Sequence, residues 1–261
     1  MASAMLAGLA KSDPQLERHV IEPFPEARAR LQTLGVHTHE IANRDAIENA
    51  DAIVLAVKPQ MLKAVCTQLA PHLSGELIVS IAAGTTIATI SKWLGGDYLR
   101  TTRIVRTMPN TPALIGQGMT GLYAPPAVSA PDIDTATALM RSCGAVLRVH
   151  DESMIDAITA VSGSGPAYVF QWIESMILAA KNVGFSDADA RTLVLQNLKG
   201  STALAEASSE SPSVLRERVT SKGGTTAAAL AVIDARGVQQ ALIDAVCAAR
   251  DRGRELGNEA D

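Results

Sequence analysis

The sequence predicts an α/β protein in which a doubly wound sheet domain is followed by an all-helical domain. Short apolar runs rich in Val and Ile alternate with helical segments as far as about residue 150, which is typical of a parallel sheet covered by helices. Beyond that point the β-branched runs disappear, and helices with clear start signals follow one another. We therefore expect a sheet domain over residues 1–150 and a helical domain over 151–261.

Each element of the first domain follows from its local pattern. Residues 2–10 are small and apolar and have the composition of a helix, although no capping residue precedes them. Strands are predicted where β-branched residues run together, and helices where apolar residues recur every three to four positions. The expected strands are 19–22, 36–39, 50–57, 76–83 and 102–108, and the expected helices are 25–35, 59–73 and 86–95.

Start signals divide the second domain into five helices. Ser186 and Asp189 form a capping box for one of them, and prolines stand in the first turn of two others. The stretch SGSGPAY is similar to a phosphate-binding loop, but it follows a helical segment, so we interpret Gly163 and Gly165 as a helix start that permits close backbone approach. A ligand role, in which the free N–H groups of the helix that begins near Pro166 face a carboxylate, explains the stretch equally well. The helices are expected over 164–184, 186–207, 211 onward, 226–237 and 238–256.

The helical domain has more apolar surface than it can bury by itself. Apolar residues occupy more than one face of 167–183, 188–207 and 227–249. In a domain of about 110 residues, this leaves apolar surface that a partner chain would cover. We expect a homo-oligomer, a dimer or larger, held together by these helices.

The overall composition excludes several kinds of partner. A net charge of −4 provides no basic field for nucleic acid or for a membrane surface. No apolar run is long enough to cross a membrane. Because the N-terminus has neither a charged leader nor a cleavage site, the expected location is the cytoplasm.

No metal site is predicted. His37 and His39 flank one exposed face of a short strand, and no third ligand is suitably spaced to join them. The cysteines make no CxxC pair, which argues against zinc, redox and disulfide roles. We expect Cys66, Cys143 and Cys247 to be buried thiols.

The spacing between Ala2 and Glu22 is that of a dinucleotide-binding site. In doubly wound folds the first strand leads through G-x-G-x-x-G/A into the first helix, and an acidic residue about 20 positions later meets the adenosine ribose. Ala2, next to Met1, fits the last small residue of that motif, and Glu22 closes the run HVIE. The first strand and two glycines of the motif would then be missing. On this spacing alone, a plain leading helix and a solvated strand end explain the two residues equally well.

Four stretches distributed along the chain identify a family resemblance: AVKPQ (56–60), RTMPNTPALIGQGMTGLY (106–123), VSGSGPAYVF (161–170) and VTSKGGTTAAAL (219–230). Together they resemble the pyrroline-5-carboxylate reductase family, in the right order and over essentially the whole chain. Members reduce 1-pyrroline-5-carboxylate to L-proline with NAD(P)H, the last step of proline biosynthesis. The resemblance implies a Rossmann-type domain followed by a helical dimerisation domain. Members usually begin with a strand and a G-x-G-N-M-A-x-A-M loop, and MASAM matches only the end of that loop.

The cofactor residues are expected where strands end, because ligands of open α/β sheets bind there. The resemblance implies that the loop containing Lys58 passes the ribose and phosphates of the cofactor. Small residues at the end of the next strand permit a flat nicotinamide to lie against the backbone, although tight packing also selects them. Asn110 can donate and accept near the ring or substrate, and a structural turn explains it equally well. The predicted cofactor residues are Met1, Ala2, Glu22, Ala56, Val57, Lys58, Pro59, Ala82, Ala83, Gly84 and Asn110.

The stretch TSKGGTT is the predicted substrate site. Its two glycines expose consecutive N–H groups, and the threonines that follow begin a helix, which makes a site for an anion such as a carboxylate. An ordinary helix N-cap explains one threonine but not the whole cluster. The resemblance implies that Ser221 and the Gly-Thr backbone hold the substrate carboxylate, with Thr226 beside the imine nitrogen. Lys222 replaces a proline found in many members. The predicted substrate residues are Ser221, Gly223, Gly224, Thr225, Thr226 and Asn110, with Thr226 as the catalytic group.

Hydride transfer also fits what the sequence lacks. The sequence contains no convincing nucleophile–base pair, no set of metal ligands and no pair of facing carboxylates. Reduction of a cyclic imine by a nicotinamide cofactor needs none of these groups. One hydroxyl donor is enough to protonate the nitrogen. The cofactor is expected to be NADP(H) or NAD(H), because Glu22 favours a free ribose diol while Arg28 and Arg30 favour a 2′-phosphate.

Two alternatives remain open. A β-hydroxyacid-type dehydrogenase would need a catalytic lysine on the first helix of the second domain, where only Lys181 is found, near the far end. A non-catalytic NAD(P)-binding regulatory protein is the other alternative, because the glycine-rich loop is missing.

Overall fold

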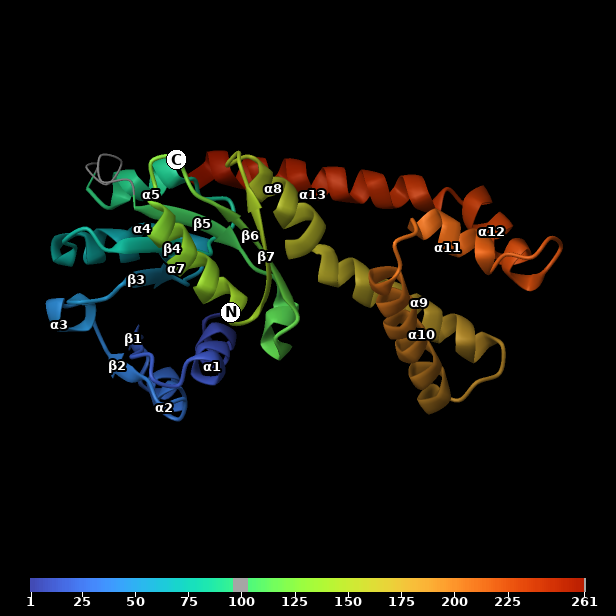
Figure 1. Ribbon diagram of the computed structural model, residues 1–261, viewed down its shortest axis with the longest axis horizontal. Coiled ribbons are helices and arrows are strands. Elements are labelled where there is room, and N and C mark those ends of the chain that lie inside the picture. Colours follow the sequence, from blue (N-terminus) through green and yellow to red (C-terminus); the bar gives the residue numbers. More distant parts are fainter. Residues whose placement is uncertain (96–102, 261) are drawn as a thin grey trace. The chain divides into compact units, whose positions relative to one another are not determined.

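The computed structural model describes residues 1–95 and 103–260, without the side chains of 258–260. It divides into two compact units (Figure 1). The first unit consists of residues 1–166 and 248–261, and the second of residues 167–247. Each unit is described by itself below.

A five-stranded sheet forms the centre of the first unit. Its spatial order is β3-β4-β5-β6-β7, and β3, β4 and β5 are mutually parallel. The strands are β3 (Ala52–Leu55), β4 (Leu77–Ser80), β5 (Ile104–Met108), β6 (Gly118–Tyr123) and β7 (Gly144–Val149). The helices beside them are α4 (Pro59–Leu69), α5 (Ile87–Trp93) and α7 (Ala130–Arg141), with the short 3₁₀ turn η1 (Ala70–His72) after α4.

Two strands of the sheet run opposite to the other three. β6 is antiparallel to β5, and β7 is parallel to β6. The segment between β5 and β6 holds only the 3₁₀ turn η2 (Thr111–Ile115), which is too short for the crossover that a parallel neighbour requires. The sequence did not predict β6, α7 or β7. The purely parallel sheet that we expected is therefore a mixed one.

A second, two-stranded sheet belongs to the same unit. β1 (His19–Ile21) pairs in parallel with β2 (His37–His39). The helices here are α1 (Ala2–Ser12), α2 (Pro25–Gln32) and α3 (Arg44–Ile47). In the described part of the chain no strand hydrogen-bonds to the outer edges of β1 and β3.

Both faces of the larger sheet are buried. Val79 and Val105 face a core shared with α1 and α7, and Ile78 and Ile104 face a core shared with α4 and α5. These four side chains are at most 1% exposed, and burial of each contributes roughly 1.5–3 kcal/mol relative to exposure. The predicted sheet with helices on both faces is confirmed.

A distorted helical segment leads out of the sheet. The helix α8 (Met154–Ile158) continues into a single π-turn, η3 (Thr159–Gly163). A Cβ added to Gly163 would lie 2.7 Å from Cε of Met108, but this methyl ends a flexible side chain that can move aside, so packing alone does not require glycine at this position. No atom lies within 4 Å of a Cβ added to Gly165, so packing does not require glycine there.

The second unit is entirely helical, as predicted. The Ser186 Oγ accepts a hydrogen bond from the Asp189 backbone N–H, which confirms Ser186 as the N-cap, and the Asp189 carboxylate accepts one from the Ser186 hydroxyl. Ser211 caps its helix in the same way through the backbone N–H of Val214. The helices are α9 (Gly165–Asn182), α10 (Asp187–Ala207), α11 (Pro212–Arg218), α12 (Thr225–Ala235) and α13 (Val238–Ala260), whose last turns belong to the first unit.

This helical unit has almost no core of its own. Within residues 167–247 only Ala190 and Val194 are buried apolar residues. Large apolar side chains such as Phe170, at 59% exposed, and Leu204, also at 59%, face outward. Surface of this kind marks a protein interface, so the prediction of self-association fits the observed burial.

Two further predictions concern single residues and the membrane. Cys66 and Cys143 are buried, but Cys247 is exposed, which corrects the expectation for that residue. Burial raises the pKa of the Cys66 thiol to about 11. Among the described helices, none is both long and apolar enough to cross a membrane.

Candidate active site

Three parallel strands carry most of the predicted cofactor residues. Ala56 and Val57 follow β3, and Lys58 and Pro59 begin α4. The Ala82–Gly84 turn follows β4, and Asn110 follows β5. Since β3, β4 and β5 are neighbours and parallel, their carboxyl ends lie at one edge of the sheet. The structure therefore brings these residues together as predicted.

The turn after β4 is closely packed. Gly84 has a φ of +73°, a conformation that favours glycine. The end of α13 lies against it, since a Cβ added to Gly257 would be 2.8 Å from the Gly84 carbonyl oxygen. A cavity of about 320 Å³ opens beside this turn. Its lining residues are Ala83, Gly84, Asp156, Thr159, Ser164, Ala249, Arg252, Gly253 and Leu256.

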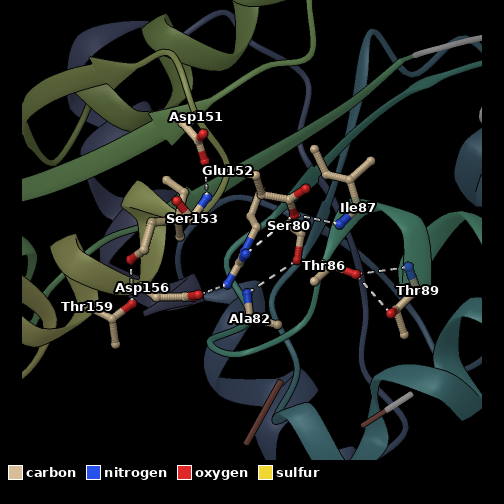
Figure 2. Close-up of polar contacts among 12 residues, drawn as sticks. Ser80, Ala82, Thr86, Ile87, Thr89, Asp151, Glu152, Ser153, Asp156 and Thr159 are labelled. Atoms are coloured by element: carbon tan, nitrogen blue, oxygen red, sulfur yellow. Dashed lines mark hydrogen bonds and ion pairs between the residues drawn. The ribbon is translucent and has the colours of Figure 1, made fainter. Parts of the chain in front are cut away.

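A buried ion-pair cluster, which we call the Arg106 cluster (Arg106, Glu152 and Asp156), stands behind this turn. The guanidinium of Arg106, 2% exposed, donates to Oδ1 of Asp156 at 2.8 Å and to Oε1 of Glu152 at 3.3 Å. The same Glu152 oxygen accepts the backbone N–H of Ile87 at 2.8 Å. Figure 2 shows the hydrogen bond that Ile87, which follows Thr86 at the start of α5, makes with Glu152, and it shows Asp156 from α8 nearby. The cluster thus joins β5, α8 and the start of α5.

Sequence reasoning missed this cluster, although a signal was present. Arg106 interrupts the apolar strand IVRTM, and a charge within a buried strand requires an ionic partner. The acidic segment DESMID at 151–156 offers such partners. The separation of 46 and 50 residues concealed the pairing.

Both ends of the Asn110 amide form hydrogen bonds within the chain. Its Nδ2 donates to the carbonyl and to the hydroxyl of Ser162, at 3.2 and 3.1 Å, and its Oδ1 accepts the Met119 backbone N–H at 2.9 Å. These bonds fix the loop after β5 to η3 and β6. Asn110 therefore holds the loop in place, and one lone pair of its oxygen is left for a ligand.

The end of β1 gives the two predicted arginines different roles. Arg28 donates to the carbonyls of Glu22 and Pro23, both at 2.8 Å, and pairs with Glu40 at 3.1 Å. The Arg28 guanidinium is thus occupied by bonds within the chain. Arg30, in contrast, is exposed and lines an open cavity of about 420 Å³ with Phe24, Pro25, Glu26 and Ala27.

Two helix starts leave donors for a diphosphate. α1, whose N-cap is Met1 and whose first residue is Ala2, has no side-chain cap. α4, with Lys58 at its N-cap, has none either. Uncapped helix starts present free N–H groups and favour anions. Together with the exposed Lys58 and Arg30, these features fit a dinucleotide with its phosphates.

The predicted substrate turn lies in the second unit. Gly223 has a φ of +74°, and the N–H of Gly224 donates to the Ser221 carbonyl at 3.0 Å, which closes the turn. α12 then begins at Thr225, as predicted, with Gly224 as an N-cap that offers no side-chain oxygen. The first N–H groups of α12 are therefore left for an external anion.

Comparison with known proteins identifies the family. A curated pyrroline-5-carboxylate reductase from Pseudomonas aeruginosa is 42% identical over 99% of this chain, and one from Haemophilus influenzae is 41% identical over 98% of it. The matches span 94% of each of these two reductases. The chain belongs to the pyrroline-5-carboxylate reductase family. Sequence models of two families match it, pyrroline-5-carboxylate reductase dimerisation at residues 152–256 and coenzyme F420-dependent NADP oxidoreductase at 1–84.

Solved structures of the same family agree. A pyrroline-5-carboxylate reductase from Coxiella burnetii, 37% identical, superposes with a TM-score of 0.89 over 98% of this chain and 94% of that one. A Plasmodium falciparum pyrroline carboxylate reductase with NADP bound, 30% identical, gives 0.85 over 98% and 94%. The dimerisation match begins close to the domain boundary predicted at residue 150, whereas the first compact unit continues to residue 166, since α8 packs on β5 and β6.

The family assignment also bears on the two alternatives. Lys181, the lysine that a β-hydroxyacid-type dehydrogenase would require, stands in the last turn of α9 and pairs with Asp187 at 2.7 Å. The match to curated reductases favours an enzyme over a non-catalytic binding protein. The match to a dimerisation family indicates that the chain associates with itself.

Proposed function

We propose that this protein reduces 1-pyrroline-5-carboxylate to L-proline with NADPH or NADH. The observation that carries the proposal is identity of 37–42% to curated pyrroline-5-carboxylate reductases over nearly the whole chain. Bound NAD(P)H would supply the hydride, which adds to the imine carbon while the nitrogen gains a proton. The protein has to hold both reactants and exclude water.

The first unit has the groups to hold the cofactor. The uncapped starts of α1 and α4 offer backbone N–H groups to the diphosphate, and Lys58 adds a positive charge. The Ala82–Gly84 turn presents no bulky side chain, so a planar ring can approach its backbone. The Arg106 cluster would keep this turn in place, because Glu152 holds the N–H of Ile87.

We further propose that Arg30 determines a preference for NADPH. Its guanidinium has space beside the end of β1, whereas that of Arg28 is occupied by Glu22, Pro23 and Glu40. Arg30→Ala should raise KM for NADPH by about tenfold or more and leave KM for NADH unchanged, because only NADPH carries the 2′-phosphate. The matched control is Arg44→Ala, which removes an exposed arginine that faces Glu48 on α3. Equal changes for both cofactors would refute this role.

The turn before α12 would hold the substrate carboxylate. Ser221 and the free N–H groups of Thr225 and Thr226 at the start of α12 would form the anion site proposed from the sequence. Within it the Thr226 hydroxyl would donate the proton that the imine nitrogen requires. Thr226→Ala should lower kcat by about 10²-fold or more, and Thr226→Ser should keep much of the activity, since the hydroxyl remains. Equal activities of the two variants would end the assignment.

A direct assay separates the proposed enzyme from its alternatives. Purified protein should oxidise NADPH in the presence of 1-pyrroline-5-carboxylate and form proline, as detected by chromatography. Binding of both ligands without turnover would favour the regulatory protein. Turnover of a β-hydroxyacid but not of the imine would favour the other dehydrogenase.

We also propose how the protein assembles, which partners it has and where it is located. We expect self-association through the second unit, whose apolar side chains lack cover in the single chain. The net charge of −4 argues against nucleic acid as a partner. A small imino acid as substrate and the cytoplasm as location complete the proposal.

A further inference from the structure

The small β1–β2 sheet gathers three of the five histidines of the chain. Its parallel register pairs His19 with His37 and Ile21 with His39. Since alternate residues of a strand share a face, all three histidines lie on one face. The His19 ring centroid is 4.9 Å from that of His37 and 5.3 Å from that of His39, and both pairs are stacked.

A carboxylate joins this face from the residues just before β1. Oε1 of Glu17 lies 2.9 Å from Nε2 of His19, and one ligand atom from each of Glu17, His19 and His37 lies within 4.8 Å of the other two. Donor atoms around a tetrahedral zinc ion are about 3.4 Å apart, given bonds of about 2.1 Å. All three side chains are exposed, so small rotations suffice to reach that geometry.

We propose that Glu17, His19 and His37 form a binding site for a divalent transition-metal ion such as Zn²⁺, with His39 orienting His19. We call these four residues the histidine cluster. Two imidazoles and one carboxylate suit Zn²⁺ and its neighbours in the first transition row. Mg²⁺ and Ca²⁺ prefer sites made only of oxygen ligands. The site thus selects a borderline-soft cation.

His39 supplies the outer support that such sites require. Its Nε2 lies 3.0 Å from Nδ1 of His19, so a metal would bind His19 through Nε2 and replace the hydrogen bond between that nitrogen and Glu17. A metal-bound histidine commonly donates its other N–H to such a partner.

The place of the histidine cluster indicates a structural role. His19 and His37 begin their strands, whereas the cofactor residues follow strand ends. A two-stranded sheet is only marginally stable by itself, and a metal that binds only the folded state stabilises that state. The ion would cross-link β1, β2 and the segment that precedes β1. This inference does not depend on the proposed reductase activity.

Calorimetric titration of the full chain with Zn²⁺ tests the site. The protein should carry no affinity tag and should carry Cys247→Ser, because the exposed Cys247 thiol is itself a zinc ligand. One ion per chain is expected to bind, and His19→Gln or His37→Gln should abolish it. His39→Ala should weaken binding by about 10–100-fold, the usual effect of losing a second-shell partner. The matched controls His72→Gln and His150→Gln, which change the two remaining histidines, should bind as the parent does.

Thermal unfolding provides a second measurement. Saturating Zn²⁺ should raise Tm of the parent and of both controls, and it should leave Tm of His19→Gln unchanged. Circular dichroism confirms that each variant is folded. A parent that binds no Zn²⁺, or a His19→Gln/His37→Gln variant that binds as tightly as the parent, overturns the proposal.

Discussion

Removal of Asp156 tests how strongly the Arg106 cluster stabilises the first unit. In Asp156→Ala the guanidinium of Arg106, 2% exposed, loses its shorter ionic bond of 2.8 Å and keeps only the bond of 3.3 Å to Glu152. Breaking a buried pair by deleting one partner costs about 3–5 kcal/mol. Since Glu152 still compensates part of the charge, we expect about 3 kcal/mol. At roughly 2–4 °C per kcal/mol for a unit of this size, Tm should fall by about 6–12 °C.

Urea unfolding followed by fluorescence measures this loss. Trp93 lies in the first unit and Trp172 in the second, so a Trp172→Phe background makes the signal specific to the first unit. Protein concentration must be held constant, because association shifts apparent stability. Asp156→Asn, which keeps an oxygen acceptor, is the control and should lose less.

A second substitution decides whether the loss comes from the uncompensated charge. Arg106→Met added to Asp156→Ala removes the buried cation and inserts an apolar side chain of similar length. We therefore expect the double variant to be more stable than Asp156→Ala. Two results would refute the reasoning. One is a decrease below about 1 kcal/mol in the free energy of unfolding of Asp156→Ala. The other is a double variant whose decrease equals the sum of the decreases in Asp156→Ala and Arg106→Met.

Three further perturbations follow from features of the first unit. Gly121→Ala should lower the free energy of unfolding by about 1–3 kcal/mol, because its Cβ would lie 2.5 Å from Cδ1 of Ile158. Ile158→Ala removes the clashing atoms, so Gly121→Ala/Ile158→Ala should be no less stable than Ile158→Ala in the same urea assay. Hydrogen bonding to Arg103 lowers the pKa of Asp132 below its ordinary 3.8, so its stabilising contribution is complete above pH 4 and is lost as pH falls further. Asp132→Asn should therefore flatten the acid side of the pH–stability curve, and an unchanged curve would contradict the assignment. Glu152→Gln keeps an oxygen for the Ile87 N–H, whereas Glu152→Ala does not; only Glu152→Ala should raise KM for NADPH, and equal kinetics would show that this bond does not position the turn.

Local pattern was sufficient to predict the three parallel strands of the larger sheet and most of the helices. The apolar runs that became β3, β4 and β5 are buried on both faces, and the capping serines begin their helices where expected. β6 escaped prediction because its segment GMTGLY is short and contains glycine. These results follow from signals that lie within a few residues of one another.

Contacts between distant segments could not be predicted from local pattern. The pairing of Arg106 with Asp156 depends on how α8 packs on β5. The histidine cluster depends on a register that matches His19 with His37, 18 residues apart in sequence, and spacing alone gives no register between parallel strands. Exposure of Cys247 depends on which face of α13 the other helices of the second unit cover. In each case tertiary or quaternary structure decides.

The helix α13 has a consequence for dissecting the molecule. Because its last turns rejoin the first unit and Gly257 lies against Gly84, the helical unit is topologically an insertion within the nucleotide-binding body. No single cut yields that body complete. A fragment that stops at residue 166 would lack one wall of the cavity beside Gly84, whereas a linker from 166 to 248 would restore it and yield an isolated dehydrogenase domain for ligand titration.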